Sequence, residues 1–81
     1  MLSKLNDAKR RVVGVKQVMR ALEQGELAAV FIAADADAKL LSPLCARAAE
    51  LSVPVHRAET MAELGNACHI QVGAAAAAVR M

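Results

Sequence analysis

A group of polar side chains that could bind an anion or a nucleic acid follows Gly14. Lys16, Gln17 and Arg20 are neighbours on one face of a predicted helix, because Arg20 lies four positions after the first and three after the second. The helix start adds unpaired backbone N–H groups and the positive end of the helix dipole. Gln17 can both donate to and accept from a base edge. The pattern suits the holding of a phosphate backbone and the reading of a base, and it equally suits the solvated face of an ordinary amphipathic helix.

Residue types that could support catalysis or bind a metal are scattered along the chain. Cys45 and Cys68 have no closely spaced partner, so we predict buried free thiols and neither a disulfide framework nor a zinc site. His69 adjoins Cys68, but a tetrahedral metal site needs four converging ligands. Asp35 and Asp37 are two positions apart, so their carboxylates are not expected to converge on one point. The sequence pattern also pairs no nucleophile with a nearby base. We therefore predict a protein that is not an enzyme and has no metal and no cofactor.

The positive charge of the chain is concentrated near its N-terminus. The formal net charge is only +2, although the chain has ten Lys and Arg residues. Those within the first quarter are Lys4, Lys9, Arg10, Arg11, Lys16 and Arg20, and Asp7 alone opposes them there. An anionic partner is therefore expected to meet the N-terminal quarter of the chain.

The length and composition indicate one small globular domain, residues 1–81. Of the residues, 57% are hydrophobic but only Phe31 is aromatic, so the core must consist of aliphatic side chains and many alanines in closely packed layers. Neither a cleavable signal nor an apolar run approaching the roughly 18 residues of a membrane span is visible. We expect a cytoplasmic protein that does not contact a membrane.

Helix and strand patterns alternate through the first half of the chain. Ser3 can cap a short helix, and residues 11–13 are typical of a brief β-branched strand. From Val15 the apolar residues follow the spacing i, i+3, i+4, i+7, which predicts a helix that ends at Gly25. Leu27–Ala34 is an uncharged apolar run and predicts a strand buried on both faces.

The alternation continues in the middle of the chain. Ser42 followed by Pro43 predicts the start of a helix, and any helical residues before Pro43 would form a separate turn. Val53–Arg57 predicts a strand at the edge of a sheet, because Pro54 removes one donor from the ladder.

The C-terminal part predicts one more helix and an ambiguous segment. Thr60 and Glu63 form a capping box at the start of that helix. Residues 74–79 favour a helix by the propensity of alanine, but their number also suits a slim central strand. The succession of elements favours an α/β fold built in layers.

Several short stretches match those of a known family. They are Gly14-Val-Lys-Gln-Val-Met-Arg-Ala-Leu22, Ile32-Ala-Ala-Asp-Ala-Asp37, Val53-Pro-Val55, and Glu63-Leu-Gly-Asn-Ala-Cys68 followed by Ile70-Gln-Val-Gly-Ala-Ala75. In order and spacing they resemble the kink-turn-binding ribosomal protein family of archaeal L-seven-Ae and eukaryotic L-thirty-e, above all its short bacterial members. The resemblance implies a three-layer α/β/α sandwich with a four-stranded mixed sheet, in which residues 74–79 form a strand. It also implies RNA binding without catalysis, with the helix after Gly14 entering a widened groove at tandem sheared G·A pairs.

The resemblance further implies which residues contact RNA. Lys16 stands where many relatives have Asn, Gln17 where they have Glu on a guanine, and Arg20 where they have Lys. Loss of the carboxylate acceptor predicts weaker discrimination of guanine. Residues 70–73 align with a loop that clasps a flipped-out nucleotide, and Asp35 aligns with an acidic position near the RNA. The implied RNA-binding residues are Gly14, Val15, Lys16, Gln17, Arg20, Asp35, Ile70, Gln71, Val72 and Gly73.

Some of these positions also have a purely structural interpretation. Ile70 and Val72 could belong to the core, and Asp35 could be a turn residue. His69, where relatives often have Gly, is expected to end the preceding helix.

The expected partner is a structured RNA that contains a kink-turn, of ribosomal or riboswitch type, together with the ribosome itself, and the protein is expected to be a monomer. One alternative is a small enzyme that uses the helix start as an anion cradle. The other is a protein-interaction module or a ribosome-associated subunit without specific RNA readout.

Overall fold

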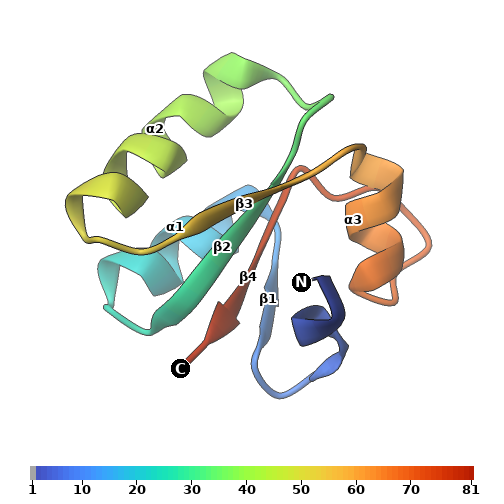
Figure 1. The fold of residues 1–81 in the computed structure, drawn as a ribbon, viewed down its shortest axis with the longest axis horizontal. Helices are drawn as coiled ribbons and strands as arrows, with labels where there is room; N and C mark the ends of the chain where they lie inside the picture. The colour runs from blue at the N-terminus through green and yellow to red at the C-terminus, as the bar shows by residue number, and fades with distance from the viewer. Residues whose placement is uncertain (1) are drawn as a thin grey trace.

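The computed structural model describes residues 2–81 and shows one mixed sheet between two layers of helices (Figure 1). Short connections join the elements, in agreement with the alternation of patterns in the sequence. In chain order the elements are the 3-10 helix η1 (Leu2–Asn6), β1 (Arg11–Val13), α1 (Val15–Glu23), β2 (Leu27–Ala33), α2 (Ala38–Glu50), β3 (Val55–Ala58), α3 (Met61–Ala67) and β4 (Ala76–Arg80).

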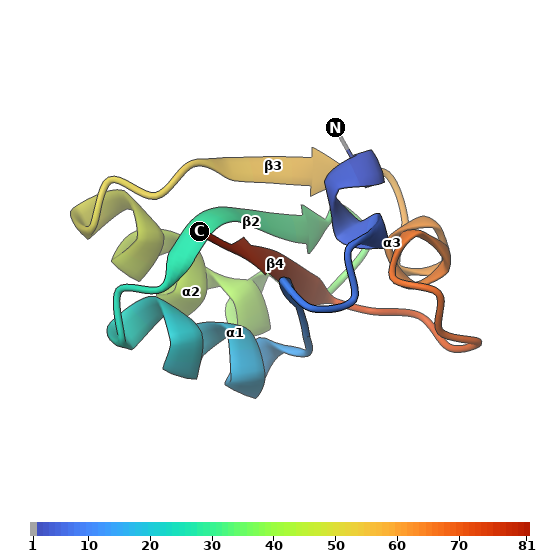
Figure 2. The same cartoon turned by 90° about the horizontal axis from the view of Figure 1, so that it is seen from below.

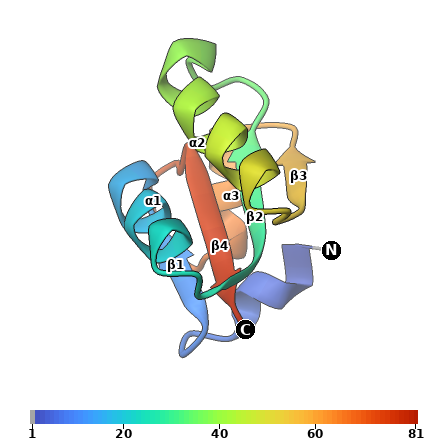
Figure 3. The same ribbon diagram turned by 90° about the vertical axis from the view of Figure 1, so that its left-hand side faces the viewer.

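The strands lie in the order β1-β4-β2-β3, so the last strand of the chain is central. β4 pairs antiparallel with both β1 and β2, whereas β2 and β3 pair in parallel. Helices α1 and α2 cover one face of the sheet, and η1 and α3 cover the other (Figures 1 and 2). Figure 3 is a view of the face that α1 and α2 cover, with β4 visible between the two helices. The predicted α/β/α sandwich with a four-stranded mixed sheet is confirmed.

β4 settles the ambiguity of the alanine-rich segment in favour of a strand. Ala76 and Ala78 face the core beneath α1 and α2, whereas Ala77 and Val79 face the core beneath η1 and α3. The three alanines are 0% exposed and Val79 is 6% exposed. Because alanine adds little height to the sheet, helices can pack closely on both faces. Pairing with two neighbouring strands therefore outweighs the helix propensity of alanine.

The strand and the long helix predicted for the first half of the chain form as expected, whereas Ser3 lies inside the 3-10 helix η1 instead of capping a helix. The strand Arg11–Val13 and the helix that starts at Val15 are both present. The helix ends just before Gly25, whose φ of 71° lies in the left-handed region. In β2, Val30 and Phe31 are fully buried in the two opposite cores, as predicted for a strand covered on both faces.

The prediction that a helix begins at Ser42 and Pro43 is wrong. One continuous helix, α2, passes through both residues. Its N-cap is Asp37, whose carboxylate accepts a hydrogen bond from the Lys39 backbone N–H at 2.9 Å. This cap, together with burial of Leu41, outweighs the backbone hydrogen bond that Pro43 cannot donate inside the helix.

The third strand and the third helix lie close to their predicted positions. β3 starts at Val55, and Pro54 precedes the strand rather than lying within it. The strand is nevertheless at the edge of the sheet, as predicted. At the start of α3, Thr60 Oγ1 accepts a hydrogen bond from the Glu63 backbone N–H at 3.0 Å. This confirms the Thr60 half of the predicted capping box.

We expect replacement of Pro43 by Ala to stabilise the protein. The side chain of Pro43 is exposed, so its loss removes no core contact, and Ala restores a backbone donor within α2. The free energy of unfolding, measured by urea denaturation, should rise by up to about 3 kcal/mol. Pro54→Ala, outside any helix, is the matched control and should bring no such gain. A destabilised Pro43→Ala variant would contradict the observed helix.

Candidate nucleic-acid interface

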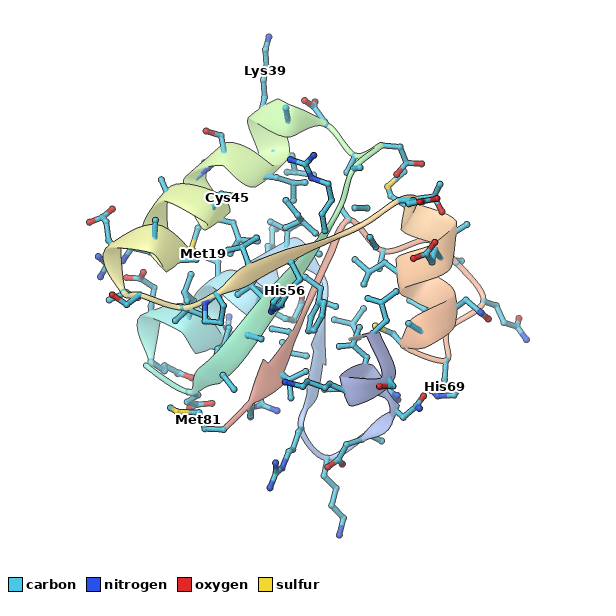
Figure 4. All side chains as sticks on the ribbon, viewed as in Figure 1. Met19, Lys39, Cys45, His56, His69 and Met81 are labelled. Carbon is cyan, nitrogen blue, oxygen red and sulfur yellow. The ribbon has the colours of Figure 1, made fainter. Side chains whose placement is uncertain are left out.

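The topology brings four chain connections to one end of the sheet. Since β1, β2 and β3 run in one direction and β4 in the other, the carboxyl ends of the first three lie beside the start of β4. The Gly14 backbone N–H donates to the Ala76 carbonyl at 3.0 Å, and the Ala34 N–H donates to the Ala58 carbonyl at 2.8 Å. We call this the Gly14 end of the sheet. Met81 lies at the other end (Figure 4).

Gly14 turns the chain from β1 into α1. Its φ of 103° and ψ of 145° are readily adopted only by glycine. As the N-cap of α1 it has no side chain that could accept hydrogen bonds from the first-turn N–H groups, unlike Asp37 and Thr60 at the other two α-helices. A Cβ on residue 14 would overlap Oε1 of Gln17, which shows that the Gln17 side chain lies back over the helix start. The first turn of α1 therefore presents N–H groups and a side-chain amide together.

The basic side chains of α1 are exposed and unpaired. Lys16 and Arg20 take part in none of the ion pairs found within residues 2–81. Glu23, the acidic residue of the same helix, is engaged by Arg47 of α2. The charges of Lys16 and Arg20 are therefore available to an anionic partner.

The remaining basic residues of the N-terminal quarter lie elsewhere. Lys4 and Arg10 line a shallow hollow with Arg80, at the end of the sheet opposite to Gly14. Arg11 donates to the Leu5 carbonyl at 3.0 Å and so holds η1 against β1. The structure thus divides the basic N-terminal quarter into two surfaces, because the chain crosses the sheet along β1 between them. Only the start of α1 reaches the Gly14 end.

The loop of residues 70–73 follows α3 and reaches the Gly14 end. Val72 is 71% exposed, so its interpretation as a core residue is wrong. Ile70 is half-buried and packs against the core beneath α3, so part of its side chain contributes to the core. His69 has a φ of 61° and ends α3 as predicted, and its Nε2 lies 2.7 Å from Asn6 Oδ1. Figure 4 shows His69 at the end of α3 from which the loop departs.

The backbone of this loop packs directly on α3. The Ala74 N–H donates to the Met61 carbonyl at 3.0 Å. Gly65 is buried, and a Cβ there would overlap the carbonyl oxygen of Val72. A Cβ on Gly73 would stand 3.0 Å from Cβ of Met61. The two glycines therefore allow the loop and the helix to touch backbone to backbone.

Asp35 connects two of the segments at the Gly14 end. Its Oδ1 accepts a hydrogen bond at 2.7 Å from the backbone N–H of Met61, the first residue of α3. The carboxylate itself is exposed to solvent. Asp35 therefore connects the β2–α2 connection to α3. This role adds to the two that the sequence suggested, a turn residue and an RNA contact.

Met61, Gly65 and Ala74 also belong to this end, although they are not among the residues predicted from the sequence. Gly65 did leave a signal, since a glycine inside a helix costs about 1 kcal/mol relative to alanine and so points to a close packing contact. Met61 and Ala74 act through their backbone N–H and carbonyl groups, and every residue except proline has both groups. No sequence pattern could single them out.

An apolar surface hollow lies far from the Gly14 end. It has a volume of about 470 Å³ and is lined by residues from the ends of α1 and α2 and the chain leading into β2 and β3, among them Leu22, Leu27, Leu51 and Pro54, with Met81. It contains none of the predicted RNA-binding residues. We therefore place the candidate interface on the open surface at the Gly14 end, where a flexible polymer rather than an enclosed small molecule would fit.

The structure also locates the cysteines and the potential metal ligands. Within residues 2–81 no group of three or more His, Cys, Asp or Glu side chains could hold a metal ion. Both cysteines are free, with Cys45 half-buried and Cys68 buried. Burial raises the pKa of the Cys68 thiol, which keeps it protonated. No helix in this part of the chain is both long and apolar enough to cross a membrane.

Known proteins resemble this chain over nearly its full length. Residues 1–81 match the Ribosomal protein L7Ae/L30e/S12e/Gadd45 family. The RNA-binding protein YbxF of Geobacillus stearothermophilus is 46% identical over 76 residues, which cover 94% of this chain and 93% of the relative. The large ribosomal subunit protein eL8 of Halobacterium salinarum is 40% identical over 67 residues, which cover 82% of this chain and 56% of the relative.

The fold is shared with a more distant solved structure. The Giardia lamblia 15.5kD RNA binding protein superposes with a TM-score of 0.91 at 23% identity, and the match covers 99% of this chain and 70% of that one. The family resemblance seen in the motifs of the sequence is confirmed by the family match and by the sequence relatives. The chain belongs to the ribosomal protein L7Ae/L30e/S12e/Gadd45 family.

Proposed function

We propose that the chain is a non-catalytic RNA-binding protein that recognises kink-turn RNA at the Gly14 end of the sheet. Family membership and relatives named as RNA-binding proteins support the partner class. The protein would act in the cytoplasm as a monomer, on a ribosomal or riboswitch-like RNA. Of the residues implied by the resemblance, the proposed contacts are Gly14, Val15, Lys16, Gln17, Arg20, Ile70, Gln71, Val72 and Gly73. Asp35 belongs to the same proposed site.

One observation carries the proposal furthest. The uncapped, basic start of α1 and the loop with exposed Val72 both adjoin the start of β4, where Gly14 donates to Ala76. A bent RNA could therefore meet a positive helix start and an apolar loop at the same time. A charged patch alone would favour any polyanion, whereas the apolar loop adds a partner for an unstacked base.

The side chains at this end suit distinct parts of an RNA. Lys16 lies in the first turn of α1, and Arg20 lies one turn further along the same face. Their exposed positive charges, next to the positive end of the helix dipole, suit phosphate oxygens. Gln17 has an NH₂ group that donates and a carbonyl oxygen that accepts, so its amide can bond to a base edge. Val72, with its exposed apolar side chain and neighbouring Gly73, suits stacking against a flipped-out base.

The first test is an affinity titration across a salt series. The RNAs are a standard kink-turn and a control in which Watson–Crick pairs replace the sheared G·A pairs. We expect clear preference for the kink-turn, and a logarithm of affinity that falls with the logarithm of salt by roughly 0.7 to 0.9 for each phosphate contacted. Equal, weak binding of both RNAs would overturn the proposal and favour a protein-interaction module.

Arg20 and Gln17 should have separable effects. Arg20→Ala should weaken binding of both RNAs and reduce the salt slope by about one phosphate contact. Lys9→Ala, which removes the same charge away from the Gly14 end, is its control. Gln17→Ala should instead lower the preference for the kink-turn by about tenfold, since a good base contact discriminates by roughly 1–3 kcal/mol. Unchanged affinity in both site variants would exclude the helix start as the interface.

Val72 provides a probe of the loop that spares the fold. Val72→Asp should weaken kink-turn binding at least about tenfold, because a carboxylate cannot stack and repels phosphate. The melting temperature should stay nearly unchanged, since the side chain is 71% exposed. Val72→Leu keeps the apolar character and is expected to bind normally. Normal binding by Val72→Asp would place the RNA away from this loop.

A further inference from the structure

We infer that Asp35 and Gly65 are positioning residues that fix the loop of residues 70–73 in a binding-ready shape through α3. The inference rests on the proposed function, because it assigns these two residues a role at the same RNA site. Asp35 then serves RNA binding without contacting RNA, and Gly65, which lies outside the predicted contact residues, becomes a determinant of the site.

A continuous chain of contacts leads from Asp35 to the loop. Asp35 Oδ1 accepts from the Met61 N–H at 2.7 Å. The carbonyl of Met61 accepts in turn from the Ala74 N–H at 3.0 Å, directly after the loop. A single residue at the start of α3 is therefore held by the β2–α2 connection on one side and holds the end of the loop on the other. A shift of Met61 would move the loop with it.

Gly65 provides the second support. It is buried one helical turn after Met61, and any Cβ at that position would overlap the Val72 carbonyl oxygen. The carbonyl of Val72 thus lies against the helix, while the side chain of Val72 is 71% exposed. A larger residue at position 65 would push the loop away from α3.

The short length of α3 makes these supports necessary. The helix has only 7 residues, and an isolated helix of that length is unstable in water. Its own N-terminal cap is Thr60, whose hydrogen bond to the Glu63 N–H stays within the helix region. The Asp35 bond differs because it ties the helix to another part of the chain, 26 residues away. Thr60 therefore stabilises the helix itself, and Asp35 fixes the position of the helix relative to the sheet.

Electrostatics favour the same assignment. A carboxylate is repelled by RNA phosphates, which disfavours a direct contact of Asp35 with the RNA backbone. In the free protein the Met61 N–H already donates to one oxygen of Asp35. The amide oxygen of Asn could accept the same bond without a negative charge. Comparison of Ala and Asn at position 35 therefore separates positioning from direct contact.

The experiment measures amide hydrogen exchange of the free protein and affinity for a standard kink-turn RNA. Asp35→Ala should accelerate exchange at Met61 and Ala74, and if the binding-ready shape falls to about a tenth of the population, the affinity falls about tenfold. The salt slope should not change, because no phosphate contact is lost. Asp35→Asn should restore both slow exchange and affinity. Thr60→Ala, which removes the other cap of α3, is the control and should lower the melting temperature while leaving exchange at Ala74 nearly normal.

Gly65→Ala tests the second support independently. It should accelerate exchange in residues 70–74 and weaken RNA binding. Gly25→Ala, strained by a φ of 71° but at the other end of the sheet, is the control for general destabilisation and should bind RNA normally.

Two outcomes would overturn the inference. The first is weak binding by Asp35→Asn with normal exchange in both Asp35 variants, which would make the carboxylate a direct contact. The second is wild-type exchange in Gly65→Ala. Failure of the proposed function has a different signature, since wild-type protein would then show no preference for kink-turn RNA, whatever the exchange measurements in the free protein give.

Discussion

The position of β4 at the centre of the sheet is the constraint on which the rest of the structure depends. This strand forms hydrogen-bonded ladders with β1 and β2, and its buried side chains are three alanines and one valine. Small side chains let α1 and α2 pack on one face and η1 and α3 on the other without a thick core. The start of the strand and the residue just before it also hold the Gly14 end together, since the Gly14 N–H donates to the Ala76 carbonyl and the Ala33 N–H to that of Ala75.

The three α-helices begin in chemically different ways. At α2 and α3, carboxylate or hydroxyl oxygens of Asp37, Thr60 and Asp35 accept hydrogen bonds from first-turn N–H groups. At α1, Gly14 provides no such acceptor, and the nearby side chains Lys16 and Arg20 are basic and unpaired within residues 2–81. The positive end of the helix dipole is therefore compensated at two helices and left open at the third. This asymmetry supports the proposal that an anionic partner binds at the Gly14 end.

The loop of residues 70–73 shows how an apolar side chain can stay exposed on a small protein. An isolated exposed Val72 would gain by turning inward, because burial of apolar surface is favourable. Its backbone carbonyl, however, is fixed against Gly65, and the chain on either side is anchored by Ile70 in the core and Ala74 on Met61. The anchors direct the side chain outward. A surface of this kind is preformed, so binding would require little ordering of the loop.

Most elements were determined by local sequence. The strand Arg11–Val13, the helix after Gly14, the apolar β2 and the cap at Thr60 follow from hydrophobic spacing and capping chemistry, and these signals act between near neighbours in the chain. The start of α2 was not predictable from Pro43, since the competing cap at Asp37 and the burial of Leu41 depend on packing. The strand assignment of residues 74–79 came from family resemblance, because alanine propensity alone leaves it open.

Only the tertiary structure decided how the binding end is assembled. The sequence by itself determined the residue types at the helix start and the composition of the loop. It could not show that Lys4 and Arg10 lie away from Lys16, that Asp35 bonds to the backbone of Met61, or that Gly65 makes room for a carbonyl. The physical reason is common to all three. These features depend on strand order and on backbone atoms brought together from distant segments, and such contacts leave no mark in the spacing of side chains.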